Sequence, residues 1–365
     1  MREQVRIGLI GTSDWADGFH LPAVASHESG GVVAICGRDR QRAEALAEKH
    51  GVPGVYTDYR AMIDQAPLDA VIVATPEDLH HPMTMAALEA GKHVLCEKPM
   101  AFSTAESQEM LDAAEAAGVK HMIQFTNRGL PHYRFVKQLL DDGYVGEPYQ
   151  AYFSWPTGWF PDSDIAGHRW AFDARRAKGA ASELGAHMID LARWFLGDVV
   201  RVSATLRNFV EMLDEDGTPM ENANDSAYLL LDFVGGAHGA VHVGSPNITG
   251  DDLHHSGQVV VISGSDGTLE ARCDPWTDPG VSEIRGLRRG ASGAATLTIP
   301  DTYLDGADPD DMFEVFMSQS IGPRLFIDAI IHDLAVSPSF SDGHAVQRII
   351  DAAVASNLTG TAQVL

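Results

Sequence analysis

Two segments of the sequence carry side chains that can move a proton to or from a bound molecule. In the first, Lys98 stands between the apolar run His93–Cys96 and Pro99. That run is typical of a buried strand, so Lys98 lies at a strand's carboxyl end, where parallel sheets place their ligands. An ammonium there can donate a hydrogen bond to an oxygen and stabilise negative charge developing on it. The alternative is a surface lysine before a turn proline.

The second segment joins acids to a histidine at helical spacing. Glu183 and His187 are four residues apart, and Asp190 follows three residues later. In the predicted helix Ser182–Leu196 these spacings bring the side chains to neighbouring turns. Imidazole is the side chain that exchanges protons most readily near neutral pH. His187 is therefore a candidate general acid or base, with a structural histidine as the alternative. Asp190 either holds the helix or orients His187.

The elements before residue 126 alternate between strand-like and helical patterns. The predicted strands are Val5–Ile10, Val32–Cys36, Ala70–Ala74, His93–Cys96 and Val119–Phe125. The predicted helices are Arg40–His50, Tyr59–Gln65, Met83–Ala90 and Ser103–Ala117. This alternation indicates βαβ units and a parallel sheet that is covered on both faces.

Beyond residue 126 the strand-like runs follow one another through turns, which favours an antiparallel sheet. Helices are predicted at Pro131–Asp142, Phe313–Val336 and Asp342–Ser356. The predicted strands are Pro148–Trp155, Val199–Arg207, Ser226–Phe233, Ala237–Val243, Gln258–Ser263, Gly267–Arg272 and Ala295–Ile299. The tract Asp274–Asp311 is rich in Gly, Pro and Asp and is predicted to be a surface excursion. The change of rhythm predicts one domain over residues 1–126 and a second over 127–365.

The composition excludes several classes of protein. With 26 basic and 51 acidic residues the net charge is −25, which argues against a nucleic-acid partner. The sequence contains no apolar run long enough to span a membrane and no secretion signal, so we expect a cytoplasmic protein. Its three cysteines are widely spaced, which fits a reducing compartment and no disulfide framework.

The turn after the first strand has the composition of a dinucleotide-binding loop. Gly11 fits the first position of the G-x-G-x-x-G fingerprint, Ser13 replaces the second glycine and Ala16 the third. Small residues let the backbone approach a pyrophosphate, and the helix that follows presents its positive end to it. Ser13 departs from the fingerprint, and it either fits or pushes the phosphates outward. The alternative is an ordinary glycine turn.

The end of the second strand bears on the choice between NAD and NADP. An acidic residue there would accept hydrogen bonds from the ribose 2′-hydroxyl and repel a 2′-phosphate. Gly37 holds that place and Arg38 follows, which favours NADP(H) because a guanidinium pairs well with phosphate. Asp39 is one step further along and leaves NAD(H) possible.

Taken in order along the chain, these segments resemble the glucose–fructose oxidoreductase / inositol dehydrogenase / rhizopine-catabolism (Gfo/Idh/MocA) oxidoreductase family. The motifs that carry the resemblance are Ala74-Thr75-Pro76 with His80-His81, Glu97-Lys98-Pro99, Thr126-Asn127-Arg128, and the tail segments Ser339–Gly343 and Asp351–Ser356. The resemblance covers nearly the whole chain.

The resemblance implies a Rossmann domain plus an α+β domain with a large open, mainly antiparallel sheet. It also implies an active site between the domains and homodimers or homotetramers that form through the open sheets. The implied reaction is hydride transfer between NAD(P) and a C–OH or C=O carbon of a sugar or polyol. The family implies that Lys98 and His187 are catalytic, and that the peptide bond before Pro99 is cis. It most often has Asp where this chain has Glu183.

The predicted site residues fall into three sets. The catalytic set is Lys98, His187 and Glu183. The cofactor-binding set is Gly8, Gly11, Thr12, Ser13, Trp15, Gly37, Arg38, Thr75, Pro76, His80, Glu97 and Lys98. The substrate-binding set is Asn127, Arg128, Trp155, Arg169, Trp170 and Asp190, with a packed aromatic cluster as the alternative for the tryptophans. The pair His254-His255 has no third ligand at metal spacing, so no metal is expected.

Two other functions are compatible with the same fold. Some relatives oxidise a sugar transiently with tightly held NAD and then cleave a glycosidic bond. Others are sensors that bind a dinucleotide without catalysis, and the presence of both Lys98 and His187 argues against that function. Fold alone does not decide between these functions.

Overall fold

The computed structural model describes residues 4–158, 166–214, 217–247, 257–275, 280–308, 310–319 and 322–365. The chain divides into two compact units. Unit 1 is Met1–Phe125 with Ile321–Gln347, and unit 2 is Thr126–Ser320 with Arg348–Leu365. The second boundary falls inside a long helix, α11 (Phe340–Thr359).

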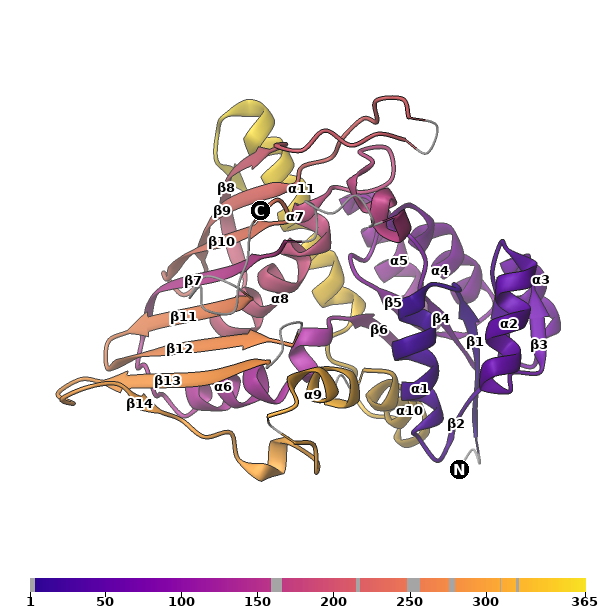
Figure 1. The fold of residues 1–365 in the computed structure, drawn as a ribbon, viewed down its shortest axis with the longest axis horizontal. Helices are drawn as coiled ribbons and strands as arrows, with labels where there is room; N and C mark the ends of the chain where they lie inside the picture. Colours follow the sequence, from indigo (N-terminus) through magenta and orange to yellow (C-terminus); the bar gives the residue numbers. More distant parts are fainter. Residues whose placement is uncertain are drawn as a thin grey trace. The chain divides into compact units, whose positions relative to one another are not determined.

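Unit 1 is built on a six-stranded parallel sheet with the order β3-β2-β1-β4-β5-β6 (Figure 1). The strands are β1 (Val5–Ile10), β2 (Gly30–Cys36), β3 (Gly54–Tyr56), β4 (Ala70–Val73), β5 (His93–Glu97) and β6 (His121–Gln124). The chain runs outward from β1 in one direction and then returns to β4 on its other side. This reversal is the topological switch point, at which sheets of this kind bind ligands beyond the carboxyl ends of their strands.

Helices cover both faces of this sheet. They are η1 (Ala16–His20), α1 (Leu21–Ala25), α2 (Arg40–His50), α3 (Tyr59–Gln65), η2 (Glu77–Leu79), α4 (His80–Glu89), α5 (Thr104–Ala117) and α10 (Gly322–His332). On one face, Ile7 and Leu9 share a fully buried core with residues of α1, α2 and α10. On the other face, Gly8 of β1 meets Met62 of α3. The predicted parallel sheet covered on both faces is thus confirmed.

Helix α10 departs from the predicted domain division. Its Phe326 and Ile327 are fully buried in the core of unit 1, beside Ile7 and Leu9. Residues 321–347 therefore belong to unit 1, although all of 127–365 was predicted to form the second domain. The apolar face of a helix reveals that it packs on something, but it does not reveal which sheet receives it.

Unit 2 is built on a nine-stranded sheet with the order β14-β13-β12-β11-β7-β10-β9-β8-β15. The strands are β7 (Pro148–Pro156), β8 (Val199–Arg207), β9 (Ser226–Phe233), β10 (His238–Gly244), β11 (Gln258–Gly264), β12 (Gly267–Asp274), β13 (Val281–Arg288), β14 (Ala295–Thr296) and β15 (Gln363–Val364). Every neighbouring pair is antiparallel except β7 and β10. The large, mainly antiparallel sheet was predicted and is confirmed.

Strand β13 lies inside the predicted surface excursion Asp274–Asp311, so that prediction was wrong for these residues. It pairs with β12 along its whole length, from Gly267 opposite Arg288 to Asp274 opposite Val281. Its exposed positions mix the charged Arg285 and Arg288 with Ser282 and Leu287, so its alternating pattern is weak in the sequence. Pairing with an existing strand edge supplies the stability that the local sequence lacks.

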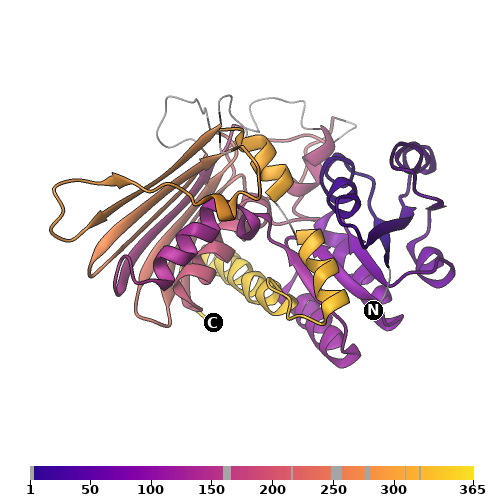
Figure 2. The same ribbon diagram turned by 90° about the horizontal axis from the view of Figure 1, so that it is seen from below.

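The helices of unit 2 include η3 (Thr126–Gly129), α6 (Pro131–Asp141), η4 (Ala166–Phe172), α7 (Ala180–Glu183), α8 (Gly185–Leu196), η5 (Asp301–Tyr303) and α9 (Met312–Gln319). Figure 2 shows α6 and α8 on the same side of the strands. The predicted helix Ser182–Leu196 breaks at Leu184 into α7 and α8. The described parts of the predicted helix Phe313–Val336 include α9 and α10.

Within the described ranges, no helix is both long enough and apolar enough to cross a membrane. Cys36, Cys96 and Cys273 are all free and buried. Burial raises the pKa of the Cys36 thiol to about 11 and those of the other two still further. These thiols are therefore packing residues rather than nucleophiles.

Candidate active site

The turn after β1 requires glycine at position 11. Gly11 has φ +129°, and an ideal Cβ there would lie 2.1 Å from the carbonyl oxygen of Ala74. Its amide donates to the carbonyl of Cys36 at 2.9 Å, so the turn is held against β2 as well. Gly8 serves a different purpose, since an added Cβ would lie 2.7 Å from the Leu68 side chain inside the core. Gly11 thus lets the turn lie close to the backbone of Ala74, whereas Gly8 leaves space for the buried side chains of Leu68 and Met62.

The structure accounts for Ser13 in place of the second fingerprint glycine. The Ser13 hydroxyl accepts a hydrogen bond from the amide of Ala16 at 3.3 Å, and the helix begins directly after it. Ser13 therefore caps the helix amino terminus, a role that serine fills well. Its side chain is exposed and bonded to the helix rather than buried under the turn.

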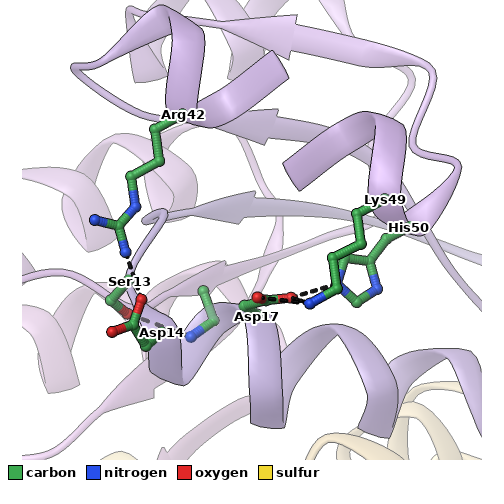
Figure 3. Close-up of polar contacts among 7 residues, drawn as sticks. Ser13, Asp14, Asp17, Arg42, Lys49 and His50 are labelled. Atoms are coloured by element: carbon green, nitrogen blue, oxygen red, sulfur yellow. Dashed lines mark hydrogen bonds and ion pairs between the residues drawn. The ribbon is translucent and has the colours of Figure 1, made fainter. Parts of the chain in front are cut away.

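Two sets of ion pairs connect this first helix to α2 (Figure 3). The Arg42 side chain donates a hydrogen bond to Asp14 at 2.7 Å. The carboxylate of Asp17 accepts hydrogen bonds from Lys49 at 2.8 Å and from His50 at 2.6 Å. Hydrogen bonds from His50 and Lys49 lower the pKa of Asp17. Exposed pairs of this kind contribute little free energy, on the order of 1 kcal/mol or less each. Their consequence is geometric, because they fix α2 beside the glycine turn.

Gly37 lets the end of β2 pack closely against the side chain of Thr12. At Gly37 an ideal Cβ would lie 2.5 Å from Cγ2 of Thr12. Asp39, the alternative ribose ligand, caps α2 by accepting the amide hydrogen of Arg42 at 3.1 Å. Arg38 stands between them with an exposed side chain. Within the described residues, Gly37 packs against Thr12 and Asp39 caps a helix, whereas the side chain of Arg38 is exposed.

The carboxyl end of β5 holds a buried acid beside Lys98. Glu97 is 7% exposed, and Oε1 accepts hydrogen bonds from Nε1 of Trp15 at 2.8 Å and from Nε2 of His20 at 2.7 Å. Its Oε2 accepts the backbone amide of Lys98 at 3.2 Å. The Lys98–Pro99 peptide bond is cis, as the resemblance implied. Lys98 is half-buried at the strand end, which is where the sequence predicted it.

The buried side chain of His80 connects two backbone carbonyls. It is 1% exposed, with Nδ1 2.8 Å from the carbonyl of Pro99 and Nε2 2.7 Å from that of Thr75. Each carbonyl needs an N–H, so both bonds at once require the protonated ring. Burial lowers the pKa of His80 overall, although both carbonyls favour the charged form. His80 thus ties the loop of Thr75 and Pro76 to the residue that follows Lys98.

In unit 2, His187 lies in the first turn of α8 and is 6% exposed. The ring of Trp155, from the end of β7, meets the imidazole edge-on with centroids 5.7 Å apart. Glu183 is the last residue of α7, and the helix breaks at Leu184 between the two side chains. Glu183 and His187 therefore do not share one continuous helix, contrary to the prediction. Leu184 is the single residue between them: α7 ends at Glu183 and α8 begins at Gly185.

Arg128 and Asp190 bind each other. The guanidinium donates twice to the carboxylate, at 2.7 and 2.6 Å, and both side chains are buried. Leaving one such charge without its partner costs ~3–5 kcal/mol, so this pair fixes η3 to α8. Of the two roles left open for Asp190, holding the helix is therefore the one that this contact supports. Whether Arg128 or Asp190 also contacts a substrate stays a prediction.

The remaining substrate candidates differ in their surroundings. Asn127 is 1% exposed, and its Oδ1 accepts from Gln258, which also accepts from the hydroxyl of Tyr133. Trp170 packs on a small apolar cluster around Phe172, which agrees with the packed-aromatic alternative. Arg169 donates weakly to a backbone carbonyl at 3.4 Å. The His254-His255 pair lies outside the described residues.

Comparison with known proteins adds an independent observation. Residues 5–125 match the family described as "Oxidoreductase family, NAD-binding Rossmann fold", and residues 133–270 match the "GFO/IDH/MocA C-terminal domain". The chain belongs to the Gfo/Idh/MocA oxidoreductase family. The family resemblance stated from the sequence is thus confirmed.

Several relatives of this Gfo/Idh/MocA chain are named sugar dehydrogenases. Levoglucosan dehydrogenase of Pseudarthrobacter phenanthrenivorans is 29% identical over 86% of this chain and 84% of its own length. A D-xylose 1-dehydrogenase (NADP(+)) of Haloferax volcanii is 34% identical over 54% of this chain and 59% of its own. Among solved structures, levoglucosan dehydrogenase in complex with NADH and levoglucosan has a TM-score of 0.88 at 25% identity and covers 99% of both chains.

The first unit of this family member fits a dinucleotide at three points. Gly11 allows backbone approach where a Cβ would meet Ala74, and a helix begins directly after Ser13. Gly37 brings β2 against Thr12. His20, whose side chain binds Glu97, was not identified from the sequence. His20 belongs to no motif and has no characteristic spacing from Glu97, so only the folded structure shows that the two side chains are partners.

Proposed function

We propose that the protein is an NAD(P)-dependent dehydrogenase that acts on a C–OH or C=O carbon of a sugar, polyol or sugar derivative. The observation that carries the proposal is Lys98 at the carboxyl end of β5, next to buried Glu97, in a chain of this family. The named activities of its relatives, oxidation of levoglucosan and of xylose, support the substrate class.

The nicotinamide, when bound, supplies or accepts the hydride. The protein's own residues handle the oxygen and its proton. Lys98 donates a hydrogen bond to the reacting oxygen and stabilises the charge that develops there as the C–H bond breaks. His187 accepts the hydroxyl proton in oxidation and returns it in reduction. Trp155, packed edge-on against the imidazole, limits the ring's orientations.

The direct test is a substrate panel. Monosaccharides, inositols, sugar acids and glycosides would be offered with NAD⁺ and NADP⁺ in turn, and nicotinamide absorbance would be followed. We expect reduction of the cofactor with at least one carbohydrate or polyol. If the only turnover were cleavage of a glycoside without added cofactor, the glycosidase-type relative would be the better description.

We further propose that the cofactor preference is for NADP(H). Position 37 is a glycine packed against Thr12 and offers no acidic side chain, Asp39 is used as a helix cap, and the exposed side chain of Arg38 lies between these positions. The Haloferax relative is named for NADP⁺, whereas the solved levoglucosan dehydrogenase complex contains NADH. The relatives therefore support both cofactors, and Arg38 is the local argument for the phosphorylated one.

Arg38→Ala should weaken NADPH binding much more than NADH binding. A hydrogen bond to a charged group contributes about 1.5–3 kcal/mol, which corresponds to a roughly 10- to 150-fold rise in the Kd for NADPH. The Kd for NADH should change by less than about threefold. Fluorescence titration of each reduced cofactor measures both. Arg40→Ala is the matched control, because Arg40 is an exposed arginine two residues away, at the start of α2, and is paired with Glu44. Equal losses for both cofactors would rule out the proposed role.

We also propose that the open sheet of unit 2 binds a second copy of the chain. Tyr152 lies on β7, and Tyr228 and Leu230 lie on β9, the two strands that flank β10; these side chains are 38%, 52% and 64% exposed. Apolar side chains gathered on one face are typical of a protein interface. Leu230→Lys should shift the protein from dimer or tetramer toward monomer in light scattering. Wild-type protein that is monomeric at micromolar concentration would contradict this proposal.

The cytoplasmic location stays a prediction. The three free thiols agree with it, because thiols stay reduced in that compartment.

A further inference from the structure

Two side chains of the first helix converge on one buried carboxylate. Trp15 and His20 both donate to Oε1 of Glu97, at 2.8 and 2.7 Å. His20 is completely buried, and Phe19 packs between the donors, stacked on Trp15 at 4.6 Å and edge-on to His20 at 5.2 Å. The acceptor adjoins Lys98 in the chain and binds its backbone amide through the other oxygen.

A π-helical turn makes this convergence possible. Trp15 and His20 are five residues apart, and in an ordinary α-helix such residues point about 140° apart around the axis. The segment η1 (Ala16–His20) is instead a π-turn, closed by a hydrogen bond from the amide of Leu21 to the carbonyl of Ala16. The wider turn brings the two side chains to the same side. Single π-turns within α-helices are rare and are frequent at functional sites.

The surroundings of Glu97 favour its charged form. Burial alone would raise the pKa of this carboxyl, but the hydrogen bond from His20, the charge of Lys98 and the hydrogen bond from Trp15 lower it overall. The charge of His20 also lowers the pKa of Glu97, and the other titratable groups that interact with this carboxylate are Cys96 on β5 and His80 on α4. Burial disfavours the charged forms of both Cys96 and His80.

We propose that Trp15 and His20 are positioning residues for Lys98: they hold Glu97 as a fixed anion, which anchors Lys98 at the strand end and balances its ammonium. The inference rests on the proposed function, because it assigns these residues to the chemistry of Lys98. It adds that the helix after the Gly11 turn supports Lys98 through Glu97. The predicted cofactor-binding turn and the end of β5 are thereby linked through one carboxylate.

The ionisation of Glu97 can be measured in the protein without cofactor. With ¹³C-carboxyl-labelled glutamate, the NMR signal that is lost in Glu97→Gln identifies this group, and its titration gives its pKa. Trp15→Phe keeps the ring stacked on Phe19 but removes the N–H, and His20→Leu removes the imidazole donor. Both changes should move the titration to higher pH, because burial is then less opposed. His20→Gln, which keeps a donor of similar reach, should restore most of the wild-type value.

The same variants should change the reaction in parallel. The acid limb of the kcat/KM profile should move to higher pH in Trp15→Phe and His20→Leu, and KM for the cofactor should change less than kcat. His50→Leu is the matched control, since His50 donates to Asp17 in the same unit but away from Glu97. A Glu97 titration that does not move would overturn the inference, and so would a moved titration with an unchanged acid limb. Full activity of Lys98→Ala would instead contradict the proposed function. The NMR measurement of the Glu97 pKa does not depend on that outcome.

Discussion

Lys98→Ala should lower kcat for sugar oxidation by roughly 10²- to 10³-fold, the usual loss when one donor to a developing oxyanion is removed. The dissociation constant for the reduced cofactor should change by less than about threefold, since the phosphates and riboses make most of the cofactor's contacts. Stopped-flow measurement of the first turnover separates the hydride step from product release. We expect the loss to appear in that first turnover.

Lys120→Ala is a suitable control for the lysine change. Lys120 also lies in unit 1, and its ammonium pairs with Asp333 at 2.7 Å rather than standing at the end of β5. Its replacement should leave turnover within about twofold, as exposed ion pairs contribute little. Wild-type turnover in Lys98→Ala, with the protein folded and binding cofactor, would remove Lys98 from the chemistry.

His187→Ala should lower kcat by roughly 10²- to 10⁴-fold, the range expected for loss of a general acid or base. The loss should be partly reversed by added imidazole, because the change opens a space beside Trp155 where a free imidazole can take the proton. Rates measured as a function of imidazole concentration and pH would show this rescue. A merely structural histidine would not give a rescue that depends on the pH titration of the added base.

The control for His187 is His238→Ala, which replaces an exposed histidine at the start of β10 in the same unit. It should leave kcat unchanged and should show no response to imidazole. Thermal unfolding of both variants should show transitions close to that of the wild type. Full activity of His187→Ala without imidazole would contradict the assignment and leave the identity of the proton acceptor open. That Lys98 and His187 act in one reaction is a prediction that the two series of variants test together.

The sequence by itself determined the family and the strand and helix pattern of unit 1, apart from the short strand β3 and the helix α10. Its signals are local: apolar runs of strand length, helix caps such as Asp39 and Ser103, and the Glu97-Lys98-Pro99 tripeptide. Such features are fixed by backbone preferences and by hydrophobic period, which neighbouring residues decide. Gly11 belongs here too, because a turn that needs positive φ selects glycine whatever the rest of the fold does.

The tertiary structure alone decided which polar groups are partners and which sheet receives a helix. The Arg128–Asp190 pair joins residues 62 apart, the Trp15–Glu97 bond spans 82, and α10 returns to the core of unit 1 after the whole of the second sheet. No local preference encodes such pairings. They form because a buried charge or donor must find a partner, and only the folded chain determines which one is within reach.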